Sequence, residues 1–148
     1  MKIDIITLGC SKNLVDSERL MRQLEAVGYE VTHDAELLTG DIAVVNTCGF
    51  IDSAKSEAID FILHTAAMKS DGLVGKILVT GCLSQRYQKQ ILEELPEVDG
   101  VLGTGSFKDI VSAIDMVMSG DYPRFFDDIH AAVDEFDRVL TTPKHYAY

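Results

Sequence analysis

Three short apolar runs constrain the fold of this chain more than any other feature of its sequence. IDIITL (residues 3–8), IAVVN (42–46) and KILVT (76–80) are rich in isoleucine, valine and leucine, and a helix-like pattern follows each of them. Strands that are apolar on both faces are typical of parallel sheets, because crossover helices cover both sides of such sheets. The sequence therefore predicts an α/β fold.

Weaker signals complete the alternation of strands and helices. Short strand-like runs occur at 29–32 and 100–102, which brings the expected number of strands to five. Strands and helices in this order suit a doubly wound five-stranded parallel sheet with the flavodoxin-like strand order 2-1-3-4-5. Gly28 is expected to end the first helix, and a helix is expected from Asp52, as its N-cap, to about Met68.

The last two helices are predicted from their own spacing. Tyr87, Ile91 and Leu95 recur at helical intervals, so we expect one helix between the fourth and fifth strands. Ser106 and Asp109 resemble a capping box, which predicts that the final helix begins at Ser106.

Composition and charge restrict the class of protein. The 148 residues are enough for one domain with a substantial core, and no window approaches the roughly 18 apolar residues of a membrane span. Asp4 interrupts the apolar run near the N-terminus, which argues against a signal peptide, so we expect a cytoplasmic protein. The formal net charge of −11 argues against direct binding of nucleic acid and fits a basic protein partner.

All three cysteines come directly after predicted strands. Cys10, Cys48 and Cys82 follow the first, third and fourth strands, which are neighbours in the order 2-1-3-4-5. Because adjacent strands lie about 4.8 Å apart, short loops could bring the three thiols together at the sheet edge where open α/β folds bind ligands. Each cysteine also precedes a predicted helix, whose dipole should lower the thiol pKa. In a reducing compartment this placement favours metal binding over disulfides.

Two kinds of metal centre fit three thiolates without a neighbouring histidine, namely an iron–sulfur cluster and zinc. Structural zinc sites usually have four protein ligands, so a cluster with three thiolates and one open iron is the better match. A flavodoxin-like module that binds a nucleotide or flavin at the same edge is the alternative.

Three glycines lie next to the cysteines, either to let the backbone close on a ligand or as ordinary turn residues: Gly9, Gly49 and Gly81. Three polar residues are expected to cap and charge the first turn of the first helix: Asn13, Asp16 and Glu18.

Several segments together resemble the N-terminal domain of the radical-SAM methylthiotransferases: LGCSKNLVDSE, VNTCGFIDSAKSE, and TGCLSQRY followed by LPEVDGVLGTG. The resemblance covers residues 1–118, and 119–148 are expected to be a linker or extension toward a radical-SAM domain. It implies that Cys10, Cys48 and Cys82 hold an auxiliary 4Fe–4S cluster, whose open iron supplies the sulfur. In that family a second cluster, bound by CxxxCxxC in another domain, cleaves S-adenosylmethionine. This chain has no such motif.

The residues of the first two motifs are closer to one branch of that family than to the other. It resembles the branch that methylthiolates an aspartate of a small-subunit ribosomal protein more than it resembles the tRNA-modifying branch. The implied partners are a basic ribosomal protein and the enzyme's own radical-SAM domain. The resemblance places no catalytic residue in this domain, and because the chain lacks the CxxxCxxC motif we expect it to be inactive in isolation.

Overall fold

A parallel sheet forms the centre of the structure, which is a computed structural model that describes residues 1–49 and 51–125. The strands are β1 (Lys2–Thr7), β2 (Glu30–His33), β3 (Ile42–Thr47), β4 (Lys76–Gly81), β5 (Gly100–Leu102) and β6 (Arg124–Phe125). The helices are α1 (Ser11–Ala26), α2 (Asp52–Ser70), α3 (Cys82–Arg86), α4 (Gln88–Glu94) and α5 (Ile110–Met118), with the 3-10 helix η1 (Thr104–Asp109) before α5. None of the helices in this part of the chain is long and apolar enough to cross a membrane.

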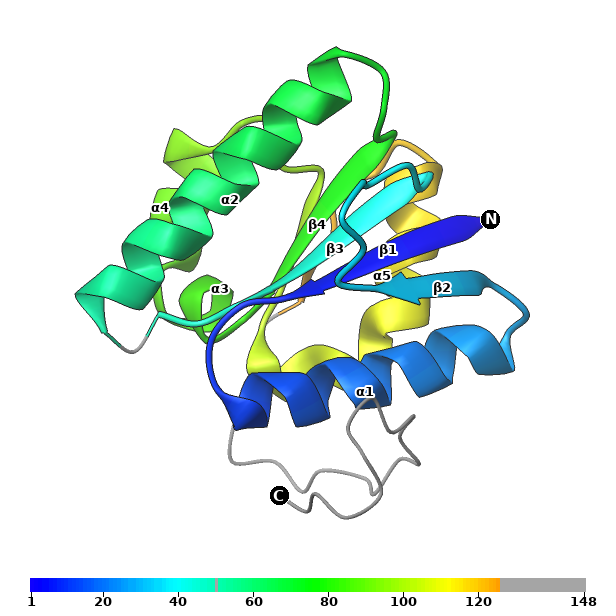
Figure 1. Cartoon of the computed structure of the whole chain (residues 1–148), viewed down its shortest axis with the longest axis horizontal. Coiled ribbons are helices and arrows are strands. Elements are labelled where there is room, and N and C mark those ends of the chain that lie inside the picture. The colour runs from blue at the N-terminus through cyan, green and yellow to red at the C-terminus, as the bar shows by residue number, and fades with distance from the viewer. Residues whose placement is uncertain (50, 126–148) are drawn as a thin grey trace.

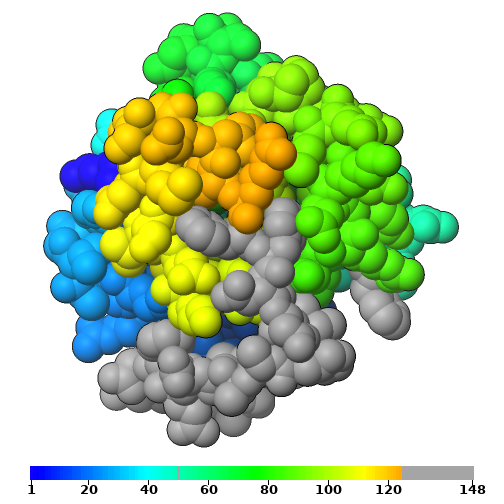
Figure 2. Space-filling model, turned by 180° about the vertical axis from the view of Figure 1, so that it is seen from behind, coloured from blue at the N-terminus to red at the C-terminus, as the bar shows by residue number. Residues whose placement is uncertain are grey.

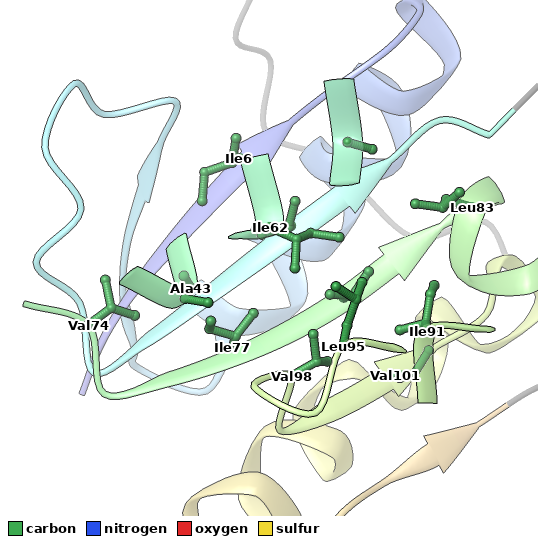
Figure 3. Packing of buried hydrophobic residues seen from close by; sticks show 14 of the residues in the cluster. Ile6, Ala43, Ile62, Val74, Ile77, Leu83, Ile91, Leu95, Val98 and Val101 are labelled. Carbon is green, nitrogen blue, oxygen red and sulfur yellow. The ribbon is translucent and has the colours of Figure 1, made fainter. Parts of the chain in front are cut away.

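Two layers of helices cover the sheet. Helices α2, α3 and α4 lie on one face, and α1 and α5 lie on the other (Figure 1). Successive residues of a strand point to opposite faces, so Ala43 and Val45 pack beneath α2 while Val44 packs with α1 and α5. Figure 3 shows the first of these cores, in which Ile62 of α2 lies over the strands. Burial on both faces explains the continuous apolar runs.

The predicted five-strand order is confirmed. The strands are parallel and follow the order β2-β1-β3-β4-β5, and Gly28 ends α1 with a positive φ of 90°, as expected.

The short strand β6 pairs in parallel with β5 and extends the sheet. Figure 2 shows this orange segment on the surface beside the yellow α5. It begins inside the predicted extension, whose remaining residues 126–148 lie outside the described part, as does Phe50.

Two expectations about helix boundaries are wrong, and one about a helix cap. The single helix expected between the fourth and fifth strands is two helices, because Tyr87 leaves the helical region with φ −120° and ψ 33°. The final helix starts at Ile110 and not at Ser106, which is buried within η1. Helix α2 begins at Asp52, as predicted, but its N-cap is Ile51 and not Asp52.

Candidate functional site

The three cysteines lie at one edge of the sheet. Cys10 caps the start of α1 after β1, Cys48 follows β3, and Cys82 opens α3 after β4. These three strands are neighbours, and Figure 1 shows that they end on the same side of the molecule. All three thiols are free; Cys10 is exposed, whereas Cys48 and Cys82 are half-buried. Three sulfur atoms from separate loops therefore lie at one partly exposed edge of the sheet.

The charges at this edge act on one another through space. Burial raises the pKa of the Cys82 thiol, the positive charge of Lys12 lowers it, and negative charge on Cys48 and Cys10 raises it again. The expectation that a helix start would lower the thiol pKa is therefore wrong for Cys82, since desolvation dominates. The mutual influence of the thiols places them within electrostatic reach of each other. A bound cation would reverse the balance and favour the thiolates.

The loops that carry the cysteines pack directly against each other. Gly9 has a φ of 111°, and a Cβ at this position would lie 2.5 Å from the Cβ of Cys48. Gly81 has a φ of 98°, and a Cβ there would collide with the backbone carbonyl of Thr47. A side chain at either position would strain the backbone and separate the loops. These two glycines thus let the three loops approach one another.

A buried amide pair joins the first two cysteine loops. Asn13 is 2% exposed and Asn46 is fully buried. The Asn13 Oδ1 accepts from the Cys10 backbone N–H at 3.4 Å, so Asn13 caps the helix as predicted. Its Nδ2 donates to the Thr47 carbonyl at 3.0 Å and to the Asn46 Oδ1 at 3.3 Å. The Asn46 Nδ2 donates in return to the Asn13 carbonyl at 2.9 Å and to the Ser17 Oγ at 2.9 Å.

Asn46 is the functional candidate that the sequence analysis missed. It is the fifth residue of a run that was interpreted only as a buried strand. One signal was available, because an amide inside a strand covered on both faces needs hydrogen-bond partners there. Its position two residues before Cys48 could then have linked it to the cysteine loops.

Two acidic side chains of α1 differ from the prediction. Asp16 and Glu18 are buried in the second turn and do not charge the first turn of the helix. Burial raises the pKa of Asp16 to about 6, while the positive charges of Lys12 and Arg19 oppose this shift. Asp16 in turn raises the pKa of Cys82 through its charge. The buried Asp16 carboxyl group therefore lies within electrostatic reach of the sheet edge that carries the three cysteines, called here the cysteine edge.

The donor set at this edge consists of three cysteine thiols on three adjacent loops. Among the described residues, no group of three or more histidine, cysteine or acidic side chains has the spacing that would hold one ion. Zinc needs all of its ligands within about 2.0–2.3 Å of one centre. In a 4Fe–4S cluster each cysteine binds a different iron, so the thiolates stand further apart. Thiolates are ligands of both kinds of centre, so the chemistry of the three free thiols is compatible with a metal or cluster site.

Comparison with known proteins gives a family and several relatives. Residues 2–103 match the sequence model described as "Uncharacterized protein family UPF0004". The chain is 51% identical over 146 residues to the ribosomal protein uS12 methylthiotransferase RimO of Bacteroides fragilis. The corresponding proteins of Flavobacterium johnsoniae and Porphyromonas gingivalis are 49% and 44% identical over 148 and 147 residues. Each alignment covers 99% of this chain and 31% of the relative, so the chain spans about a third of the length of these curated relatives.

Proposed function

This chain belongs to the uncharacterized protein family UPF0004, and we propose that it is the N-terminal cluster-binding domain of a ribosomal protein methylthiotransferase. The observation that carries the proposal is the presence of three free thiols on three adjacent strand ends whose loops are packed together. Identity of about half of the residues to uS12 methylthiotransferases supports this choice over the tRNA-modifying branch.

Within this proposal Cys10, Cys48 and Cys82 would hold a 4Fe–4S cluster, each through its thiolate. Such a cluster supplies an open iron that can carry the sulfur to be transferred. The chain itself contributes the three thiolates, the amide pair that joins two of their loops, and a partly buried setting on the side of Cys48 and Cys82. The positive charge of Lys12 offsets part of the negative charge that gathers at this edge.

The remaining parts of the activity belong to the longer protein. A second cluster and S-adenosylmethionine would be bound by a radical-SAM domain outside this chain, which would leave the isolated chain inactive. The substrate would be an aspartate of the basic ribosomal protein named in the relatives. The net charge of −11 supports attraction of a basic protein in the cytoplasm.

Iron loading tests the proposal. After anaerobic reconstitution with iron and sulfide, the chain is expected to bind about four irons and to show the brown colour of a 4Fe–4S cluster. Replacement of any one of the three cysteines by alanine should lower the iron content to less than about one per chain, because a cluster held by two thiolates is readily lost. Iron and labile sulfide per chain are the measurements. Unfolding by urea serves as the control, since these partly exposed side chains contribute little to the core.

Two results would contradict the proposal. One is a wild-type chain that stays colourless and takes up no iron. The other is saturable binding of flavin or nucleotide that survives in the variant without cysteines, because this would favour the flavodoxin-like alternative.

A further inference from the structure

Asn46 lies where the three cysteine loops meet. Its Nδ2 donates to the Asn13 carbonyl at 2.9 Å, and the Asn13 Nδ2 donates back to its Oδ1 at 3.3 Å. The same Oδ1 would lie 2.6 Å from a Cβ at Gly81, so the third loop packs against it as well. One buried amide side chain, two residues before Cys48, thus contacts the start of α1 after Cys10 and the glycine before Cys82.

The partner amide extends the contact to the cysteine backbone. Asn13 Oδ1 accepts from the Cys10 N–H and lies 3.4 Å from the Cys10 Sγ, which can donate to it while the thiol is protonated. The Asn13 Nδ2 holds the Thr47 carbonyl, next to Cys48, at 3.0 Å. A single side chain therefore bridges the residue of the first sulfur and the residue adjacent to the second.

Further hydrogen bonds fix this pair from outside. Ser17 Oγ accepts from Asn46 at 2.9 Å and from the Thr7 hydroxyl at 2.7 Å, which ties the pair to the end of β1. On the other side the Thr47 hydroxyl donates to the Thr80 carbonyl at 2.6 Å, which joins the ends of β3 and β4. Buried polar networks of this kind restrict a structure to one arrangement when their donors and acceptors are paired.

We propose that Asn13 and Asn46 are positioning residues that preset the spacing of the three thiols before any metal binds. The identity of the bound group rests on the proposed function above, but the preset spacing does not. Outer-shell groups that orient metal ligands typically change metal affinity by about 10- to 100-fold when they are removed. A merely structural role would lower stability and leave thiol spacing unchanged.

The spacing can be measured in the metal-free chain. In a Cys82→Ala background only Cys10 and Cys48 remain, and dibromobimane becomes fluorescent when both of its ends have reacted with thiols. We expect Asn46→Ala and Asn13→Ala to slow formation of this cross-link several-fold, because the loops are no longer held together. Asp4→Ala is the matched control. It also removes three buried or half-buried hydrogen bonds, but to β2 and the residue 39–40 loop and not to the cysteine loops.

A second readout uses the reconstituted chain with all three cysteines. Loss of iron to a chelator should be about tenfold faster in the two asparagine variants, at the low end of the effect of outer-shell partners. The electron paramagnetic resonance spectrum of the reduced cluster should also broaden. Asp4→Ala should leave the rate of iron loss and the spectrum unchanged while it lowers the urea midpoint.

The outcomes separate this proposal from the proposed function. Folded asparagine variants that cross-link at the wild-type rate would overturn the positioning role, even where their stability has fallen. If Asn46→Ala does not fold, Asn13→Ala decides, because it leaves the bond from Asn46 to Ser17 in place. A wild-type chain that takes up no iron would contradict the proposed cluster-binding function. The positioning role of Asn13 and Asn46 would still be decided by the cross-linking rates.

Discussion

At the scale of single residues, Asp16 shows how burial sets the charge at the cysteine edge. The side chain is 7% exposed, and its pKa is raised from 3.8 to about 6 because the carboxylate is desolvated. Between pH 3.8 and pH 6 the folded chain binds more protons at this site than the unfolded chain. The free energy of unfolding therefore falls as the pH rises through this interval.

Substitution of Asp16 by asparagine should remove this pH dependence. A shift of about two pH units corresponds to about 3 kcal/mol, so Asp16→Asn should gain up to that amount relative to wild type between pH 4 and pH 7. The measurement is urea unfolding of both proteins at several pH values. Asp60→Asn, which removes one charge from an exposed position on α2, is the control and should show a small, pH-independent difference. If the difference in free energy of unfolding between Asp16→Asn and wild type were equally independent of pH, it would disprove the cost of burying the Asp16 carboxylate.

Residues of the site differ in how far sequence alone can assign them. Cys10, Cys48 and Cys82 could be assigned to one edge, because each follows a strand and the strand order follows from the fold class. The position of Asn46 near Cys48 could be read from the sequence, but its pairing could not, since the partner Asn13 lies 33 positions away. The burial of Asp16 was also hidden, because it depends on what packs against α1.

At the scale of elements, the Asp4 carboxylate connects β1 to the segment between β2 and β3. Its oxygens accept from the Thr32 hydroxyl and from the backbone N–H groups of Thr39 and Gly40, the last two at 2.8 and 2.7 Å. Asp4 itself is 1% exposed. A carboxyl group is tolerated in such a buried position because several donors satisfy its oxygens.

Two substitutions of Asp4 should lower the free energy of unfolding by different amounts. Asp4→Ala leaves both backbone N–H groups without their acceptor and should destabilise the chain by about 3 kcal/mol. Asp4→Asn should cost only about 1 kcal/mol, because the amide can turn its oxygen to the two N–H groups and donate to Thr32. Urea unfolding measures both, and amide hydrogen exchange at Thr39 and Gly40 should accelerate more in the alanine variant. Equal losses in the two variants would show that charge, and not pairing, holds this segment.

The elements also differ in predictability. The continuous apolar strands were predicted because burial on both faces leaves no other pattern. The break at Tyr87 was not, because the helical spacing of Tyr87, Ile91 and Leu95 begins at the break and describes only α4 and its two caps. Tyr87 packs against the core while the Lys55 ammonium lies 4.0 Å from the centre of its ring. Tertiary contacts of this kind override a local periodicity.

At the scale of the whole molecule, the sheet continues beyond residue 118 into the segment 119–148 that was expected to be a linker or extension. Strand β6 lies beyond residue 118 and pairs with β5, and the Val101 N–H donates to the Pro123 carbonyl at 3.0 Å. Pro123 is buried, and a Cβ at Gly100 would lie 2.8 Å from its Cγ. The segment 119–125 thus covers the edge of β5, which would otherwise expose backbone donors and acceptors.

Shortened chains should reveal this contribution. A chain that ends at residue 118 uncovers β5 and loses the Val101 bond and the packing of Pro123, so we expect it to be about 2 kcal/mol less stable than a chain that ends at residue 125. Urea unfolding of the two chains, with the full chain as reference, gives the difference. Pro123→Ala in the longer chain isolates the packing part, since it keeps the carbonyl that accepts from Val101. Equal stability of the two shortened chains would place the boundary at residue 118, whereas the expected loss extends the folded domain at least to residue 125.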